Sequence, residues 1–312
     1  MILCFKLNKM EQNGGVEPRI FYGKEKMPSE LKKYEVNGTH VWVGKLYKVN
    51  NIKQERPINF YIRPLNKGDS EQMGKLSESI YHYLKNGEEC FIHKHTKEYF
   101  YEVFDNPKIR YIGVFVGKNL VGMSYIRICE NKKDLQEELP NCEYNFYHHR
   151  RNGGKNKVAS MGGDSVLPLY RGNALNTIMI NYRIEQAQRL GCTDCTSIVD
   201  RKNRWNMAPY FSCNFNLFST AIDPSDGGKI SLLHKPMDKE SVLSCFKPRI
   251  SIPYERLEVI DYMISKGFVG IDFDKEKGAV LFAHTQYYNQ QNYHAHKNYQ
   301  IIDIKRRFAK AL

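Results

Sequence analysis

The chain has 312 residues, of which 41% are hydrophobic and 12% aromatic, enough for one large domain or two modest ones. No run of about 18 apolar residues occurs, which argues against a membrane-spanning helix. The net charge of +13 is spread along the chain. This spread favours an anionic ligand or substrate over a dedicated nucleic-acid binder, which usually concentrates its charge on one element. The opening stretch, MILCFKLNKM, is too short and too charged for a secretory signal.

The eight cysteines are scattered, and only Cys192 and Cys195 form a CxxC pair. A structural zinc site needs four ligands and no second CxxC is present, so we predict buried or incidental thiols. The histidines of HHRR (148–151), and His294 with His296, lack carboxylate or cysteine partners, so we predict no metal site. Thiols of this kind are typical of a reducing compartment, and we expect a cytoplasmic protein.

The N-terminal part, residues 1–55, is predicted to be a separate extension, in which 39–49 have strand character. Pro57 predicts a break before a clear strand over 58–65. Apolar residues at helical spacing then predict a helix over 69–84, capped by Asp69 or Ser70. A second, shorter helix is expected over 96–106.

The middle of the chain begins with two strands, 109–117 and 120–129, whose junction Gly-Lys-Asn is typical of a hairpin. Residues 130–157 are charged and broken by glycines, and we interpret them as an insertion. The elements expected after it are a strand over 158–168, a helix over 173–190 ended by Gly191, a strand over 195–200, a short helix over 203–215 in which Pro209 is awkward, and a strand over 229–236.

The tail predicts a strand at 249–252, a helix over 254–267 and two strands, 268–273 and 279–284. The succession of helix, Gly-Phe and hairpin resembles that of the preceding region and suggests a degenerate half-repeat. The order of all elements predicts a mixed α/β sheet with helices on both faces.

The stretch YRGNALN, residues 170–176, opens the predicted helix over 173–190. The unpaired N–H groups of a helix start bind phosphate oxygens, Gly172 lets backbone approach a ligand, and Arg171 adds a cation. The stretch is neither a P-loop nor a GxGxxG motif. The same residues also suit an ordinary tight turn from strand to helix, so both interpretations stand.

A second block follows one strand later, with Asn203, Asn206, Tyr210, Asn214 and Phe215 spaced as N-x-x-N-x-x-x-Y-x-x-x-N-F. Together the two blocks resemble the GNAT superfamily of acetyl-CoA-dependent N-acyltransferases, over about residues 58–236. That family shows V-x-P-x-Y-R-G-x-G-hydrophobic-G/A and then N-x-x-A-x-x-x-Y-x-x-x-G-F. Here Ala174 and Asn176 replace the glycine and the glycine or alanine of the first block, and Asn214 replaces the glycine of the second.

The resemblance implies a mostly antiparallel central sheet with an N-terminal extension (1–55), an acetyltransferase domain (56–236) and a small α/β C-terminal region (237–312). It implies transfer of an acetyl group from acetyl-CoA to an amine by direct attack in a ternary complex. The residues it assigns to binding coenzyme A are Val166, Arg171, Gly172, Asn173, Ala174, Leu175, Asn176, Thr177 and Asn203.

In the same resemblance Tyr210 protonates the leaving thiolate, and a backbone N–H on 164–166 stabilises the oxyanion. The base is Asp164, Glu143 or an ordered water. The structural alternatives are a half-buried aromatic for Tyr210 and a surface acid for Asp164.

We expect a small-molecule or peptide amine as the acceptor, and neither nucleic acid nor a membrane as a partner. Two other functions stay open: a GNAT-fold protein that binds acyl-CoA without turnover, and a basic nucleic-acid-associated protein.

Overall fold

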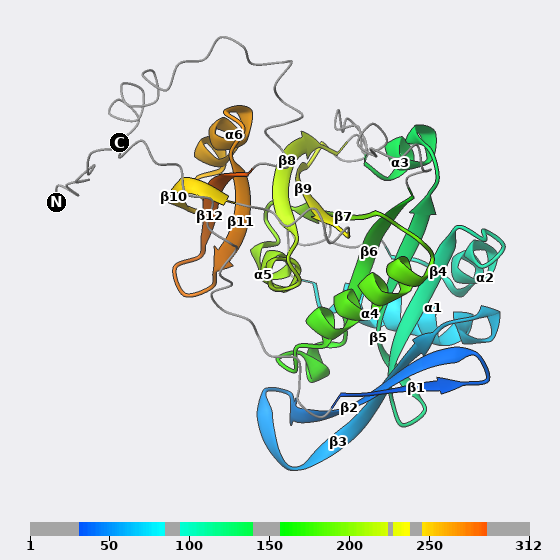
Figure 1. Cartoon of the computed structure of the whole chain (residues 1–312). Helices are drawn as coiled ribbons and strands as arrows, with labels where there is room; N and C mark the ends of the chain where they lie inside the picture. Colours follow the sequence, from blue (N-terminus) through cyan, green and yellow to red (C-terminus); the bar gives the residue numbers. More distant parts are fainter. Residues whose placement is uncertain (1–30, 85–93, 140–156, 224–226, 238–244, 286–312) are drawn as a thin grey trace.

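The computed structural model describes residues 31–84, 94–139, 157–223, 227–237 and 245–285 (Figure 1). They form one 12-stranded sheet in the order β1-β2-β3-β4-β5-β6-β7-β9-β8-β11-β12-β10. Within this described part, β6 and β7 are the one pair that runs parallel, and the other pairs are antiparallel. The predicted mixed, mostly antiparallel α/β fold is confirmed.

The strands are β1 (Lys32–Val36), β2 (Thr39–Val49), β3 (Ile52–Pro64), β4 (Ile109–Val116), β5 (Asn119–Cys129), β6 (Val158–Val166), β7 (Asp194–Asp200), β8 (Asn216–Ile222), β9 (Lys229–Pro236), β10 (Cys245–Pro253), β11 (Val269–Asp274) and β12 (Ala279–Thr285). The helices are α1 (Ser70–His82), α2 (Lys97–Val103), α3 (Lys132–Glu138), α4 (Leu175–Arg189), α5 (Arg204–Ser212) and α6 (Leu257–Ser265), with 3-10 turns η1 (Lys67–Asp69) and η3 (Pro168–Tyr170). None of these helices is long and apolar enough to cross a membrane.

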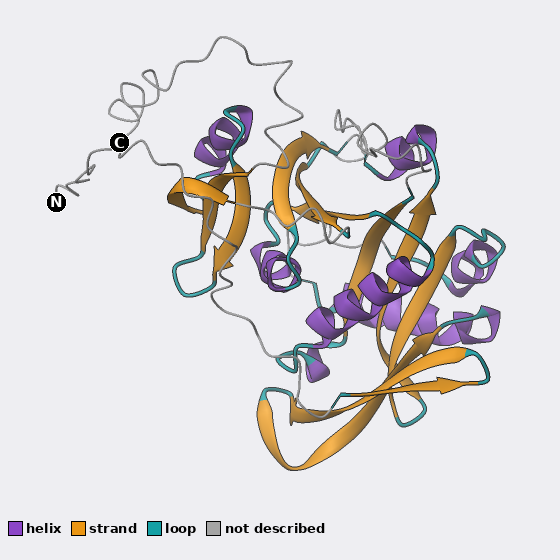
Figure 2. Cartoon of the chain, in the orientation of Figure 1, coloured by secondary structure: helices purple, strands orange, loops and turns teal. Residues whose placement is uncertain are grey.

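Helices cover both faces of the sheet, as predicted (Figure 2). Successive side chains of a strand point to opposite faces, so β4 contributes to two cores. Its Ile112 and Val114 pack under α4, whereas Tyr111 and Phe115 pack under α1 and α2 on the other side. The α4 face continues into a core that α4, α5 and α6 share with β5, β6, β8 and β12. The C-terminal region is therefore packed against the same core as α4.

The predicted break at Pro57 is wrong, because β3 runs through it from Ile52 to Pro64. The β2–β3 register shifts where Leu46 pairs with Ile58 but Lys48 pairs with Lys53. Pro57 lies in the irregular stretch of β3 between these pairs, where its missing N–H interrupts no regular ladder bond. Residues 32–55 are thus part of the sheet, and the domain boundary predicted between 55 and 56 falls inside a strand.

Three elements, β1, α3 and β8, were not predicted. The helix α3 lies in the stretch interpreted as an insertion, and the Asn131 side chain caps it by accepting from the Asp134 N–H at 3.0 Å. The strand β8 joins β9 to β11, and its sequence NLFSTAI lacks a clear alternation because the buried Asn216 opens it.

The segments β7-α5-β8-β9 and β10-α6-β11-β12 share one local architecture. Each hairpin pairs its second strand with the strand before the helix, which gives the orders β7-β9-β8 and β10-β12-β11. Each hairpin also contains a register shift, between Leu217 and Ser219 in the first segment and between Gly270 and Asp272 in the second. These positions are 53 residues apart in the sequence.

The helix ends of the two segments match at the same offset. Asn214 and Gly267 both take the left-handed conformation, with φ of 67° and 79°. The N–H of Phe215 donates to the Tyr210 carbonyl at 3.1 Å, and that of Phe268 donates to the Met263 carbonyl at 3.0 Å. The succession of helix, turn and Phe noted in the sequence therefore corresponds to two similar three-dimensional units.

Candidate functional site

A gap opens between β6 and β7, the two parallel strands. Their pairing begins at Val158 with Asp194 and stops after Met161 with Ser197, although β6 continues to Val166 and β7 to Asp200. The other edge of β6 carries a bulge, in which Gly163 and Asp164 lie between the paired residues Gly162 and Ser165. Gly163 has a φ of +66°, which glycine adopts without strain. The bulge therefore lies in the part of β6 that no longer pairs with β7.

A buried polar cluster lies at this gap. The Tyr210 hydroxyl of α5 donates to the Asp164 carboxylate at 2.5 Å, and the Arg183 guanidinium of α4 forms an ion pair with the other carboxylate oxygen. Arg183 also donates to the carbonyls of Tyr125 at 3.1 Å and Gly162 at 3.3 Å. Tyr210 and Arg183 are fully buried, and the Asp164 side chain is 4% exposed. Asp164 is therefore not a surface acid, and Tyr210 is not half-buried.

Burial sets the protonation of this cluster. It raises the pKa of Asp164 above its usual range, and the Arg183 cation opposes that rise. Burial also raises the pKa of Tyr210, and the neighbouring Asp164 carboxylate raises it further. Tyr210 therefore keeps its proton at neutral pH and presents it in a fixed direction.

The first turns of α4 and α5 meet beside the cluster. The Asn176 amide donates to the Asn206 side-chain oxygen at 2.5 Å, and Asn206 also hydrogen-bonds Asp164. Neither Arg183 nor Asn206 was among the predicted site residues. The position of Arg183 could have been noticed in the sequence. It lies one helical turn after Met179, close to Ile180 and Ile184 on the apolar face of α4, where a charged residue is unexpected.

The start of α4 has the features expected of an anion site. Its N-cap is Ala174, with φ of 55° and ψ of 20°, and no side chain caps the helix. Gly172 has a φ of +79°, and the Arg171 side chain donates to the Val166 carbonyl at 3.1 Å. A left-handed non-glycine residue costs about 1–2 kcal/mol, and such strain concentrates at functional sites.

The Asn173 side chain is occupied by a structural contact. It accepts from the N–H groups of Tyr47 and Lys48, both at 3.0 Å, and donates to the Lys48 carbonyl at 2.8 Å. It thereby fixes the β2–β3 hairpin to the loop before α4. Leu175 is likewise buried in the core, at 2% exposure. Any contribution of these two residues to a ligand site comes from their backbone.

Asn203 is the N-cap residue of α5, but its side chain makes no capping bond. Asp200, the last residue of β7, does not cap this helix either. Its carboxylate accepts from the Lys202 N–H at 2.7 Å and so stabilises the turn before the helix. The Asn203 side chain therefore has no capping role at the start of α5.

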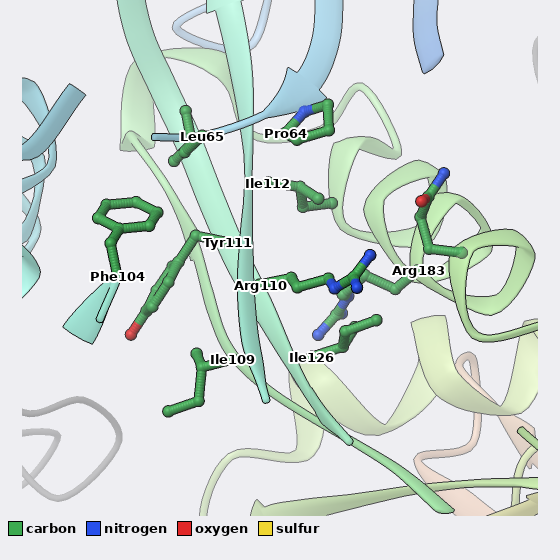
Figure 3. Close-up of a pocket in the computed structure, with 10 residues that line it drawn as sticks. Pro64, Leu65, Phe104, Ile109, Arg110, Tyr111, Ile112, Ile126 and Arg183 are labelled. Carbon is green, nitrogen blue, oxygen red and sulfur yellow. The ribbon is translucent and has the colours of Figure 1, made fainter. Parts of the chain in front are cut away.

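A pocket of about 150 Å³ lies where β3 ends, away from the start of α4 (Figure 3). Arg110 from β4 and Arg183 from α4 point into it from opposite sides, and its other walls are mostly apolar. None of the predicted site residues lines this pocket, although Arg183 connects it to Asp164.

The remaining predictions divide into two groups. Glu143, His148, His149, His294 and His296 lie outside the described residues. Cys192 and Cys195 are buried as predicted, and burial raises the pKa of Cys192 to about 11. In the part of the chain that the structure covers, no three His, Cys, Asp or Glu side chains gather as a metal site would require.

Replacing Ala174 by glycine is expected to raise the free energy of unfolding by about 0.5–1 kcal/mol. The relief of about 1–2 kcal/mol of left-handed strain exceeds the cost of about 0.4–1 kcal/mol from the more flexible unfolded chain. Urea denaturation measures the change. Ala187→Gly is the matched control, because Ala187 lies buried within α4 and its loss is expected to destabilise by at least about 1 kcal/mol. A loss of stability in both variants would contradict the strain at Ala174.

No protein-family model matches this sequence, and neither does any curated protein. The fold is similar to that of solved acetyltransferase structures, each compared over 57% of this chain. Arabidopsis thaliana NAA60 in complex with acetyl-CoA is 16% identical, with 98% of its chain covered and a TM-score of 0.43. PaiA N-acetyltransferase from Thermoplasma acidophilum with coenzyme A is 18% identical (98%, 0.40), and a GNAT-family acetyltransferase from Streptococcus pneumoniae is 13% identical (99%, 0.41). At these identities the likeness concerns the fold alone.

Proposed function

We propose that the chain is an N-acetyltransferase of the GNAT type, which moves an acetyl group from acetyl-CoA to an amine. The observation that carries this proposal is the gap between β6 and β7, which ends beside the uncapped start of α4 and holds the hydroxyl of Tyr210. A gap between parallel strands offers unpaired backbone groups to an extended ligand, and a helix start offers N–H groups to a phosphate.

Coenzyme A fits the residues present. The N–H groups from Gly172 to Thr177 would hold the diphosphate, with Arg171 beside them, and the backbone of Val166 and the side chain of Asn203 would hold the pantetheine arm. The strained Ala174 is the observation that favours this fit, since a left-handed residue there turns successive N–H groups outward. Acetyl-CoA supplies an acetyl group activated as a thioester.

Tyr210 is proposed as the acid that protonates the leaving sulfur. Its hydroxyl is the one group of the cluster that keeps a transferable proton at neutral pH and has a fixed position. Both oxygens of Asp164 already accept, one from Arg183 and one from Tyr210. We therefore assign Asp164 to positioning Tyr210, and leave removal of the amine proton to a water or to another group.

The acceptor is proposed to be an amine of a small molecule or a peptide. The proteins of similar fold include one in complex with a bisubstrate analogue and one bound to a peptide and coenzyme A. We place the protein in the cytoplasm, because Cys129, Cys192, Cys195 and Cys213 are all free thiols, which a reducing compartment preserves.

A second candidate function is binding of acyl-CoA without turnover. The observation that favours it is the 2.5 Å contact of Tyr210 with Asp164, which directs the tyrosine proton to a carboxylate and not to an open site. This candidate shares the cofactor site and differs only in the chemistry.

The test is a pair of measurements on the full chain. Acetyl-CoA at about 100 times its Kd should stabilise the protein by about 2.7 kcal/mol, which raises the melting temperature by on the order of 5 °C. Release of free thiol in the presence of a panel of amines then separates the two candidates. Stabilisation with release supports the transferase, stabilisation without release supports the binding protein, and no stabilisation contradicts both.

A further inference from the structure

An exposed aromatic and cationic pair stands at the start of α5. Trp205 is 76% exposed, more than any other large hydrophobic side chain in the described part of the chain. The Arg204 guanidinium lies over its indole ring, 4.7 Å from the ring centroid. Arg204 therefore covers one face of the indole and leaves the side chain open to a further stacking partner.

The pair is next to the proposed site for coenzyme A. Asn206, which follows Trp205, accepts from Asn176 in the first turn of α4 at 2.5 Å. Asn203, which precedes Arg204, is the uncapped N-cap residue of α5. Arg204 and Trp205 thus lie between two residues that border the gap.

The second β-α-β-β unit serves as an internal comparison. The turn residues, the Phe after the helix and the hairpin bulge recur 53 residues later, so this scaffold needs them. The counterparts of Arg204 and Trp205 at that offset are Leu257 and Glu258. The unit therefore folds without an aromatic-cation pair at the start of its helix.

The turn between β11 and β12 of the second unit also lies close to Arg204. A Cβ atom built on Gly278, in the turn between β11 and β12, would lie 4.0 Å from an Arg204 nitrogen. The apolar surface of Trp205, which is 76% exposed, stays hydrated and contributes nothing to the core, while the neighbouring Arg204 lies close to this turn. Such a side chain is better suited to binding a ligand than to stabilising the fold.

We propose that Arg204 and Trp205 form the nucleotide end of the site, where the indole of Trp205 stacks on a purine base and Arg204 holds the stack by its charge. This inference rests on the proposed function, since the purine is the adenine of coenzyme A. Stacking on a base and the attraction of a cation to a ring need no hydrogen bonds to the edges of the base. Because both act on the base itself, the pair should add affinity for the nucleotide half of the ligand only.

The experiment compares acetyl-CoA with S-acetylpantetheine, which lacks the nucleotide, by calorimetric titration of the full chain. Trp205→Ala is expected to weaken acetyl-CoA binding about tenfold, in line with the loss of one stacked base, and to leave S-acetylpantetheine binding unchanged. Trp205→Phe should retain most of the affinity. Tyr83→Ala removes another exposed aromatic, 64% exposed at the end of α1, and should change neither.

Fluorescence gives an independent readout, because Trp42 is buried at 2% exposure and Trp205 is the only other tryptophan. Acetyl-CoA should quench the emission of wild type, and this quenching should disappear in Trp205→Ala. If wild type binds acetyl-CoA and Trp205→Ala binds it equally well, the inference is wrong while the proposed function stands. If wild type does not bind acetyl-CoA, both are wrong.

Discussion

Replacing Arg183 by methionine is expected to destabilise the protein by about 3–5 kcal/mol, because it leaves the Asp164 carboxylate buried without its cation. Methionine keeps much of the side-chain length, so the loss reports charge more than volume. Urea denaturation measures the free energy of unfolding. Arg183 also donates to the carbonyls of Tyr125 and Gly162, which would lose these donors and add to the cost.

The loss should depend on pH. In Arg183→Met, Asp164 keeps the burial that raises its pKa and loses the cation that opposes the rise. The folded state then binds a proton at a higher pH than the unfolded chain, whose Asp pKa is about 3.9. Stability of the variant therefore falls as the pH rises through the pKa of the folded state. The deficit relative to wild type should shrink as the pH is lowered toward about 4.

Two further variants test the cause. Asp164→Asn in the Arg183→Met background removes the unpaired charge and should recover about half of the lost stability or more. Arg189→Met is the control on the same helix, because its ion pair with Glu185 at 3.2 Å is nearly half exposed and should contribute less than about 1 kcal/mol. Equal effects of the two arginine substitutions would contradict a buried ion pair at Asp164.

Tyr210→Phe is expected to lower kcat for acetyl transfer by about 10²–10⁴-fold and to leave the Kd for acetyl-CoA nearly unchanged. The ring stays in the core and only the proton donor is removed. A loss of this size is the contribution that a positioned general acid typically makes to the rate. Rates of thiol release and calorimetric titration measure the two quantities. The variant also loses a charge-assisted hydrogen bond to Asp164, worth about 1.5–3 kcal/mol, so its melting temperature must be checked first.

Tyr182→Phe is the matched control for this prediction. Tyr182 is also fully buried, and its hydroxyl donates to the His40 carbonyl at 2.7 Å, away from the gap. Its loss should lower stability by about 1 kcal/mol and leave kcat unchanged. A Tyr210→Phe variant that is folded and as fast as wild type would limit Tyr210 to a structural role.

The sequence by itself determined the local elements. The helix predicted over 173–190 corresponds to α4 at Leu175–Arg189. The prediction was possible because the apolar residues recur every three or four positions, which places them on one face of a helix. The Gly117–Asn119 turn likewise predicted the β4–β5 hairpin, in which Val116 pairs with Asn119. Where tertiary pairing overrides the local signal, the prediction is wrong. Pro57 lies within a strand because an irregularity in β3 accommodates it.

The sequence also named Tyr210 and Asp164 as separate candidates, Tyr210 from the second motif block and Asp164 as the carboxylate two residues before the first block. Only the tertiary structure joined them, since they are 46 residues apart in the sequence and the Tyr210 side chain of α5 reaches Asp164 near the end of β6. The third member, Arg183, had to be found in three dimensions. A charge buried on an apolar helix face is costly until a partner on a neighbouring element, here Asp164 on β6, pairs with it, and no local pattern specifies that partner.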